Sequence, residues 1–582
     1  PGEDIPEQVI LDVNQLAEGQ PFMALGASEI SDDGHLLAYS TDNTGFRQYR
    51  MHIRDLRSGQ IRDLPDTAEN TGTLTWAADN QTLFYTVEDE AKRHYRLYRH
   101  PLGGPVEQDQ LIYEETDERF NLGAYRTRSK QYVILQIESH TTTEARYLAA
   151  ADPTAEFTMI EPRRDDVQYS VDHHGDRFYL RINDTGRNFR LISTPVATPT
   201  EEHWTEILPA RPDVMLESVE LFADFYVLHE LANGLPVFRI GRYDAPGFQS
   251  VEFPEPTYTA SPSANAEFIT TQFRYTYQSL VTPRSVFDYD VNAQSSTLLK
   301  EIEVPGYDRT QYISERMWAT ARDGVKVPIS LVYRKDLFAA AHGKSPLYLY
   351  GYGSYGFVTP VGFSSNRLSV LDRGVVFAIA HIRGSGDLGK PWHDAGKMMH
   401  KMSTFTDFID VTEFLISQEY GDCRRIAAEG GSAGGLLMGA ITNLRPDLYR
   451  AIVSHVPFVD VMNTMLDASL PLTVAEYEEW GDPNQQPAYE YMRSYSPYDN
   501  LKPVNYPAIL VKTSFHDSQV MYWEPAKYVA KLRTLKQDNH PLLLKSNMAA
   551  GHGGASGRYD YLHEIAFDYA FLLWQLDVEA GQ

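Results

Sequence analysis

The chain has 582 residues, of which 42% are hydrophobic and 23% charged, so it is long enough for two or more globular domains. Its 52 basic and 79 acidic side chains give a net charge of −27, which argues against nucleic acid as a partner because phosphate contacts need basic surfaces. No apolar run approaches the roughly 18 residues of a membrane span, so we expect no membrane partner. The one cysteine, Cys423, excludes an intramolecular disulfide, and we expect a packed structural thiol in a reducing, cytoplasmic compartment.

Residues 1–304 contain a repeated unit in which a polar turn precedes an apolar or alternating strand. The strands are marked by Tyr39, Tyr85, Leu135, Leu180, Val227 and Ile269, at intervals of 42 to 50 residues. A period in the forties with about four strands per unit predicts a β-propeller of about seven blades, six of them visible. The alternative is a pair of β-sandwiches with accidental spacing. Because Pro1 falls inside a blade, we expect the first blade and an N-terminal extension to be missing.

From residue 305 to 582, continuous apolar strands alternate with helical segments. The strands are expected at residues 346–350, 375–379, 425–428, 508–511 and 542–544, and a last helix at residues 559–575. Apolar strands separated by helices indicate a mostly parallel sheet covered on both faces, as in an α/β-hydrolase domain.

The segment from Gly430 to Gly434 has the pattern G-x-S-x-G between an apolar strand and a small-residue helix. In that context the turn exposes the Ser432 hydroxyl as a nucleophile, and the flanking glycines permit close backbone approach. The N–H of Ala433, at the start of the helix, points toward a developing oxyanion. The segment therefore predicts a serine hydrolase.

A serine nucleophile needs a base and an orienting carboxylate, which in this fold class follow it along the chain. Asp517 comes after the strand at 508–511, and His552 lies in a glycine-rich loop after the strand at 542–544. Catalytic side chains of open α/β sheets lie beyond the carboxyl ends of the strands. We therefore predict Asp517 as the acid and His552 as the base, in preference to His516, which directly precedes the acid.

A second oxyanion donor is expected from the loop after the strand at 346–350. That loop contains Tyr350, Tyr352 and Tyr355 and lacks the His-Gly-Gly-Gly form that supplies backbone N–H groups in many esterases. A tyrosine hydroxyl can take the place of the missing donor. The spacing alone does not choose among the three tyrosines.

The layout of a propeller followed by a hydrolase unit, with the motifs at Tyr352, Ser432 and His552, resembles the prolyl oligopeptidase family of serine peptidases. Residues 516–527 and 494–500 are similar to its oligopeptidase B branch. The resemblance covers essentially the whole chain. It implies an endopeptidase that cuts short peptides after Arg or Lys, with the propeller excluding folded proteins. It also implies the triad Ser432, Asp517 and His552, with Tyr352 as the oxyanion tyrosine.

The resemblance extends to the pocket for the substrate side chain. Residues 471–481 match the family's basic-residue pocket and implicate Glu476 and Glu478, because carboxylates pair with guanidinium and ammonium groups. Other members carry two aspartates within the stretch that corresponds to residues 357–363, which has none here, so we expect a weakened preference for dibasic sites. Gln519 stands where proline-cleaving members have an arginine. By comparison, roughly a hundred N-terminal family residues are absent.

The predicted chemistry needs no cofactor and no metal, and His563-Glu564 lacks the second histidine of H-E-x-x-H. The expected partners are short basic peptides, and the expected state is a monomer. Two alternatives remain open. A prolyl or acylaminoacyl peptidase shares the architecture but needs an apolar pocket in place of Glu476 and Glu478. A catalytically silent propeller scaffold is the second alternative, against which the complete Ser–Asp–His set argues.

Overall fold

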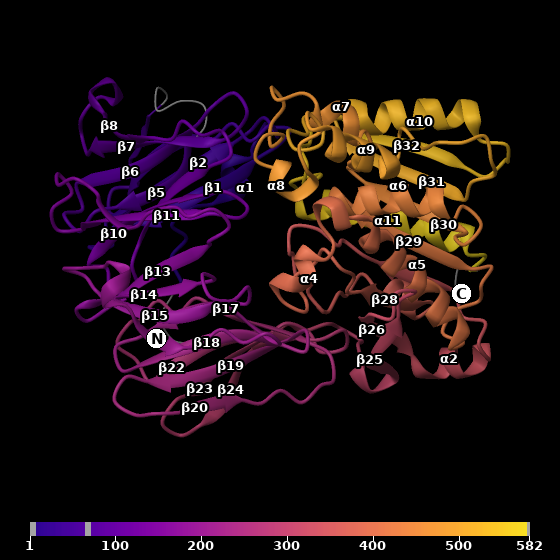
Figure 1. Cartoon of the computed structure of the whole chain (residues 1–582), viewed down its shortest axis with the longest axis horizontal. Helices are drawn as coiled ribbons and strands as arrows, with labels where there is room; N and C mark the ends of the chain where they lie inside the picture. The colour runs from indigo at the N-terminus through magenta and orange to yellow at the C-terminus, as the bar shows by residue number, and fades with distance from the viewer. Residues whose placement is uncertain (1–6, 65–70, 579–582) are drawn as a thin grey trace.

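The computed structural model describes residues 7–64 and 71–578. Two units face each other across the molecule, a set of four-stranded sheets and an α/β unit with helices on both faces of one large sheet (Figure 1). The first unit holds six antiparallel four-stranded sheets within the described residues, each built from consecutive strands. The predicted propeller is therefore confirmed, with six blades described.

The six blades are named here A to F in chain order. Blade A holds β1 (Ala24–Ile30), β2 (Leu36–Asp42), β3 (Arg50–Asp55) and β4 (Ile61–Asp63), and a short helix α1 (Val13–Leu16) precedes it. Blade B holds β5 (Thr71–Trp76), β6 (Thr82–Glu88), β7 (His94–Pro101) and β8 (Gln110–Glu114). Blade C holds β9 (Asn121–Arg126), β10 (Tyr132–Glu138), β11 (Thr143–Ala149) and β12 (Thr158–Glu161). Blade D holds β13 (Tyr169–His174), β14 (Arg177–Ile182), β15 (Arg190–Pro195) and β16 (Thr205–Leu208). Blade E holds β17 (Val214–Leu221), β18 (Phe225–Ala232), β19 (Leu235–Arg242) and β20 (Phe248–Val251), and blade F holds β21 (Thr259–Pro262), β22 (Gln272–Gln278), β23 (Ser285–Asp290) and β24 (Ser295–Glu301).

Blades pack face to face through apolar side chains that alternate along the strands. In β22, Phe273, Tyr275 and Tyr277 are buried against blade E, while the residues between them are only partly covered. Successive side chains of a strand point to opposite faces of the sheet, so this alternation is expected where one face packs more tightly against a neighbouring blade than the other. Similar clusters lie between the other consecutive pairs, from A and B to D and E.

One predicted repeat is misplaced. Five of the six marker residues lie in the second strand of a blade, but Ile269 lies in a loop with its side chain 82% exposed. The second strand of blade F begins three residues later, at Gln272. Phe268 and Ile269 lie in the loop between β21 and β22 of blade F. This loop contacts blade E, where the Ala223 N–H donates to the Phe268 carbonyl.

The second unit is built on one eight-stranded sheet in the order β25-β26-β28-β27-β29-β30-β31-β32. Its strands are β25 (Tyr312–Thr320), β26 (Lys326–Arg334), β27 (Leu347–Tyr350), β28 (Val376–Ala380), β29 (Ile426–Gly431), β30 (Ala451–His455), β31 (Ala508–Ser514) and β32 (Leu542–Asn547). β25 and β26 pair antiparallel at one edge, and the strands from β28 to β32 are parallel. The mostly parallel sheet is as predicted, and the β25–β26 hairpin and β30 had not been predicted.

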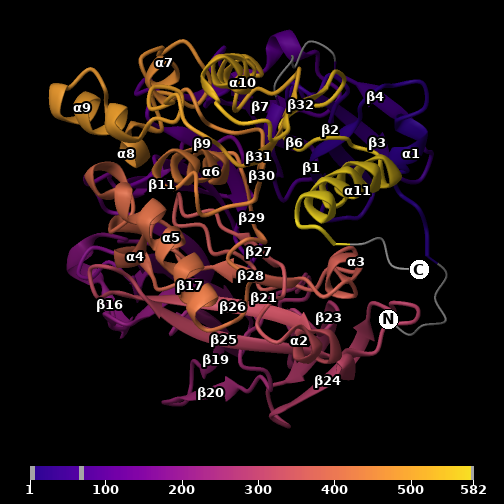
Figure 2. The same cartoon turned by 90° about the vertical axis from the view of Figure 1, so that its right-hand side faces the viewer.

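Helices cover both faces of this sheet. The helices described in this unit are α2 (Lys335–Ala341), α3 (Leu368–Leu371), α4 (Lys390–Asp394), α5 (Met402–Ser417), α6 (Ala433–Leu444), α7 (Val461–Met465), α8 (Tyr477–Trp480), α9 (Gln486–Tyr495), α10 (Trp523–Leu535) and α11 (Arg558–Gln575). Figure 2 shows α3 and α11 on one side and α5 and α6 on the other. In β27, Leu347 and Leu349 face the α5–α6 core while Tyr348 faces α11, which explains the continuous apolar run.

Cys423 is exposed, so the prediction of a packed thiol is wrong. It lies in the turn between α5 and β29, where Asp422 accepts hydrogen bonds from Arg424, and the cysteine is left facing solvent. No helix in the described part of the chain is long and apolar enough to cross a membrane.

Candidate active site

Ser432 lies at the junction of β29 and α6, where the backbone turns sharply. It is the N-cap residue of α6 with φ 56° and ψ −117°, a conformation that L-residues rarely adopt. Its N–H donates to the His455 carbonyl at 2.9 Å, which fixes the turn against β30. Ala433 is the first residue of the helix, so its N–H has no acceptor within the helix and is free for a ligand.

The glycines of the motif are required by close backbone packing. A Cβ at Gly430 would stand 2.3 Å from the Gly434 carbonyl oxygen, and one at Gly435 would stand 2.5 Å from Pro457. Any larger residue would push β29 and α6 apart and displace the serine between them. The expected strand–turn–helix geometry is therefore present.

Asp517 and His552 lie on two loops that leave neighbouring strands. His552 Nδ1 is 2.7 Å from Asp517 Oδ2, and Asp517 Oδ1 accepts the Gln519 and Val520 N–H groups at 2.9 and 3.0 Å. The loops are also joined along their backbones, because the His516 N–H donates to the Ala550 carbonyl at 3.1 Å. A carboxylate only accepts, so the imidazole proton is on Nδ1 and Nε2 is available as a base. The Asp517 side chain is fully buried, whereas His552 is 18% exposed.

Ser432 and His552 line two different cavities. Ser432 lies on the wall of a cavity of about 230 Å³, and His552 on that of a larger one of about 610 Å³. Within the described residues no hydrogen bond joins the serine hydroxyl to the imidazole. The three predicted residues thus lie at the same edge of the sheet, with the acid–base contact formed and the base–serine contact open. Their catalytic roles stay predictions that variants can test.

The three candidate oxyanion tyrosines have different surroundings. Tyr352 lines the 230 Å³ cavity beside Ser432, and its pKa is raised by burial although its hydroxyl hydrogen-bonds that of Ser432. Tyr355 lines the same cavity but bonds the Glu476 carboxylate, and Tyr350 lines the larger cavity. Burial keeps the phenol of Tyr352 protonated, which is the form that can donate to an oxyanion. The geometry therefore favours Tyr352.

We expect Tyr352→Phe to lower kcat by roughly 10²–10³, because one oxyanion-hole donor typically contributes that much. KM should change little, since the lost hydrogen bond matters mainly once negative charge develops. Steady-state kinetics on one peptide reporter, with Tyr350→Phe as the matched control, check this. A Tyr350→Phe variant that loses as much kcat as Tyr352→Phe would contradict the assignment.

Glu476 lies half-buried on the wall of the cavity that holds Ser432. Its carboxylate accepts the Trp480 indole N–H at 2.7 Å and the Tyr355 hydroxyl, both of them neutral donors. Burial raises the pKa of Glu476 to about 7. Among the described residues no lysine, arginine or histidine forms an ion pair with it. A partly desolvated carboxylate without a counter-ion is stabilised when a ligand cation completes the site.

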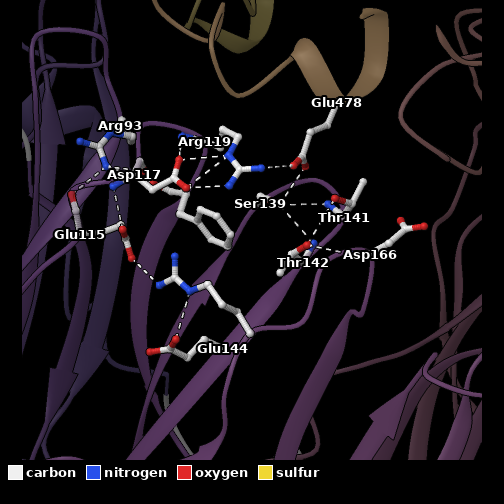
Figure 3. A network of polar contacts seen from close by, with 12 residues as sticks. Arg93, Glu115, Asp117, Arg119, Ser139, Thr141, Thr142, Glu144, Asp166 and Glu478 are labelled. Carbon is white, nitrogen blue, oxygen red and sulfur yellow. Dashed lines mark hydrogen bonds and ion pairs between the residues drawn. The ribbon is translucent and has the colours of Figure 1, made fainter.

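Glu478 does not line that cavity. Figure 3 shows its carboxylate reaching into the propeller, where Oε2 accepts the Ser139 hydroxyl at 2.8 Å and Oε1 lies 3.7 Å from Arg119. Glu476 and Glu478 are two positions apart around α8, so their side chains point to nearly opposite sides. The structure therefore separates the two glutamates that the sequence grouped in one pocket.

Glu479, His393 and Lys401 form a buried network beneath the tyrosine loop that sequence reasoning missed. Glu479 accepts the Tyr355 N–H at 2.8 Å and contacts His393 Nε2 at 2.7 Å. Burial alone would raise the pKa of Glu479, but His393 and Lys401 lower it to about 2. Lys401 in turn donates to the Gly353 carbonyl at 2.6 Å. The network thus holds the loop that carries Tyr352.

Within residues 7–64 and 71–578, no cluster of three or more His, Cys, Asp or Glu side chains is arranged to hold a metal ion. The reactive groups that the structure places at the site are the serine hydroxyl, the imidazole, the carboxylates and the phenol described above. These groups suit nucleophilic acyl transfer.

The propeller, the hydrolase sheet and the serine elbow define a two-domain serine peptidase. Residues 1–302 match a family model described as "Prolyl oligopeptidase, N-terminal beta-propeller domain", and residues 361–579 match one described as "Prolyl oligopeptidase family". The chain belongs to the prolyl oligopeptidase family.

Several relatives are similar over nearly the whole chain. Dipeptidyl aminopeptidase BI of Pseudoxanthomonas mexicana is 45% identical, over 99% of this chain and 80% of the relative. Protease 2 of Moraxella lacunata is 39% identical, over 100% of this chain and 84% of the relative. Among solved structures, oligopeptidase B of Leishmania major superposes with a TM-score of 0.95 at 37% identity, covering 99% of this chain and 82% of that one.

Proposed function

We propose that the protein is an endopeptidase that cleaves short peptides on the carboxyl side of Arg or Lys through an acyl-enzyme. The observation that carries this proposal is Glu476, the one carboxylate among the described residues that line the cavity of Ser432. A guanidinium or ammonium group in that cavity would supply the counter-ion that the half-buried carboxylate lacks. A proline or phenylalanine side chain would leave the charge unpaired.

In the proposed reaction Ser432 attacks the carbonyl that follows the basic residue. His552 takes the hydroxyl proton on Nε2 and returns it to the leaving amine, while Asp517 holds the Nδ1–H tautomer and stabilises the imidazolium. The Ala433 N–H and the Tyr352 hydroxyl bind the developing oxyanion. Water then attacks the acyl-enzyme, with His552 taking the proton of the water and returning it to the Ser432 oxygen. The step requires His552 to approach Ser432 more closely than in this structure.

A second candidate activity follows from the relatives. One is named Protease 2 and another a dipeptidyl aminopeptidase. The latter activity removes residues two at a time and requires a free amino group two residues before the scissile bond. The two activities share the serine chemistry and differ in whether a blocked amino terminus is accepted.

Paired reporters with Ala-Arg before the cleaved bond, one acetylated and one with a free amino terminus, distinguish these activities. We expect the acetylated reporter and longer peptides with an internal Arg to be cleaved at comparable kcat/KM. Cleavage that requires the free amino group would favour the dipeptidyl aminopeptidase activity instead. Ser432→Ala serves as the blank for background hydrolysis.

We further propose that the preference for a second basic residue is weak. Residues 357–363 contain no carboxylate, although Phe357 and Phe363 line the larger cavity beside His552. The carboxylates deeper in that cavity are already engaged, as in the 2.9 Å pair of Asp568 with Lys512. The same assay with Arg-Arg in place of Ala-Arg should give kcat/KM within about tenfold, an energy difference near 1.4 kcal/mol. A much larger gain for Arg-Arg would contradict this.

The selectivity for a charged side chain should depend on pH through Glu476. Its pKa is raised to about 7, so the carboxyl is neutral well below pH 7 and anionic above it. The ratio of kcat/KM for Arg over its neutral isostere citrulline should therefore rise between pH 6 and 8 and then level off, because only the anion attracts the cation. The ratio cancels the titration of His552, which acts on both substrates. A flat ratio in the wild type would contradict the role of Glu476.

A further inference from the structure

One loop of the propeller touches both loops that carry the predicted acid and base. The loop spans residues 42–47, joins β2 to β3 in blade A, and is called the docking loop here. It is held by the buried Asp42, whose Oδ1 accepts the Thr44 N–H at 2.8 Å and whose Oδ2 accepts the Arg47 N–H at 2.9 Å. The docking loop is thus internally braced and presents a defined surface to the hydrolase unit.

The first contact reaches the loop of Asp517. Arg47 Nε donates to the Ser518 hydroxyl at 2.9 Å, and its guanidinium lies 3.5 Å from the Ser518 carbonyl oxygen. Ser518 is buried and directly follows Asp517. A guanidinium that holds both the side chain and the backbone of this residue restricts where the preceding carboxylate can lie.

The second contact reaches the loop of His552. Gly45 and Gly551 meet backbone to backbone, so that a Cβ at Gly551 would stand 2.0 Å from the Gly45 oxygen, and one at Gly45 would stand 3.0 Å from the Gly551 nitrogen. Gly551 immediately precedes His552. Both glycines are therefore needed for this approach, and a side chain at either one would push the two loops apart.

Blade B supports the docking loop from behind. Lys92 Nζ donates to the Arg47 carbonyl at 3.4 Å and lies 3.5 Å from the Glu88 carboxylate. The side chains of Lys92 and Glu88 are each only 4% exposed. His94 lies 3.4 Å from the same carboxylate. Arg47 is thus held by contacts within blade A and by Lys92 of blade B.

We propose that the docking loop sets the register of Asp517 and His552 toward Ser432, with Arg47 as a positioning residue. The inference rests on the proposed roles of these three residues. Ser432 is fixed by β29 and α6 inside the hydrolase unit, whereas the acid and base lie on loops that end against the propeller. The base–serine hydrogen bond is not formed in this structure, so whether it forms depends on where these loops lie. Misplacement by about 1 Å costs roughly 100-fold in rate.

The test compares Arg47→Ala, Arg47→Lys and Gly45→Ala with a matched control, Arg316→Ala. Arg316 also bridges the two units, by donating to the Asn233 carbonyl, but it lies on β25 away from the catalytic loops. We expect Arg47→Ala and Gly45→Ala to lower kcat roughly 10- to 100-fold with little change in KM. Arg47→Lys should recover part of the loss, and Arg316→Ala should stay within about twofold of wild type.

A second readout is the rate at which a small phosphonofluoridate labels Ser432, measured by mass spectrometry. This reagent needs the activated serine but no Arg or Lys pocket, so its rate should fall in step with kcat. Wild-type labelling and kcat in Arg47→Ala would overturn the inference, as would an effect on KM alone or an equal loss in Arg316→Ala. A wild-type protein that neither labels at Ser432 nor cleaves peptides would instead refute the proposed function.

Discussion

Ser432→Ala should lower kcat by roughly 10⁴–10⁶ on any peptide that the protein cleaves, the largest effect that we expect from a single substitution. The strained turn at the start of α6 presents this hydroxyl, and without it the acyl-enzyme cannot form. Residual catalysis would come only from substrate binding and the oxyanion donors. The measurement is single-turnover hydrolysis of a fluorogenic peptide at saturating enzyme.

The matched control is Ser494→Ala, which removes an exposed hydroxyl on α9 that only bonds the Tyr491 carbonyl. It should retain wild-type kcat, and both variants should keep the wild-type Tm. More than a tenth of wild-type turnover in purified Ser432→Ala protein would exclude a serine mechanism at this position and would point to another nucleophile.

Glu476→Gln should produce the second largest effect, confined to substrates with a basic side chain. Removing one partner of a buried charge pair costs about 2–5 kcal/mol, which corresponds to roughly 30- to several-thousand-fold in kcat/KM. Citrulline and other neutral side chains should lose little, because glutamine keeps the size of the residue and can still accept the Trp480 N–H. The kinetics of paired Arg and citrulline peptides measure the difference.

Stability provides an independent check on Glu476→Gln. The pKa of Glu476 in the fold is about 7, above its unfolded value, so wild-type stability is lost as the pH rises toward and through 7. Because glutamine does not ionise, the variant does not lose this stability, and its Tm at pH 8 should equal or exceed that of wild type. A variant that melts lower and loses all substrates equally would indicate structural damage.

Glu478→Gln separates the role of Glu478 in α8 from that of Glu476, the N-cap residue of the helix. Because Glu478 faces Arg119 and Ser139 of the propeller, its loss should change the Arg-over-citrulline ratio far less than the loss of Glu476. An equal effect of both substitutions would support the prediction from the sequence that Glu476 and Glu478 line one pocket.

Much of the architecture could be predicted because its signals are local. Repeats in the forties predict the blades, and apolar runs such as Leu347–Tyr350 predict strands covered on both faces. The nucleophile elbow is likewise encoded within a few residues around Ser432, where glycines are required by close backbone contacts. The repeat failed at Ile269 because a short apolar stretch in the loop between β21 and β22, within blade F, resembles a strand in sequence.

Other features could not be predicted because they join residues far apart in the sequence. His393 and Glu479 meet under the tyrosine loop, and Arg47 reaches Ser518 across the domain interface. The orientation of Glu478 depends on the start of α8, which a short acidic run does not define. No local pattern marks such contacts, since the first depends on how the loops of the hydrolase unit pack and the second on how the two units pack together.

The most direct measurement of the central claim is kcat/KM of the wild-type protein on acetylated peptides that differ only in the residue before the cleaved bond. The carboxylate of Glu476, half-buried beside Ser432 and without an ion-pair partner among the described residues, predicts that Arg and Lys exceed citrulline, Pro and Phe by at least about 100-fold, an energy near 2.7 kcal/mol. Faster cleavage after Pro or Phe would contradict it, and would leave a serine peptidase of this family with a different specificity.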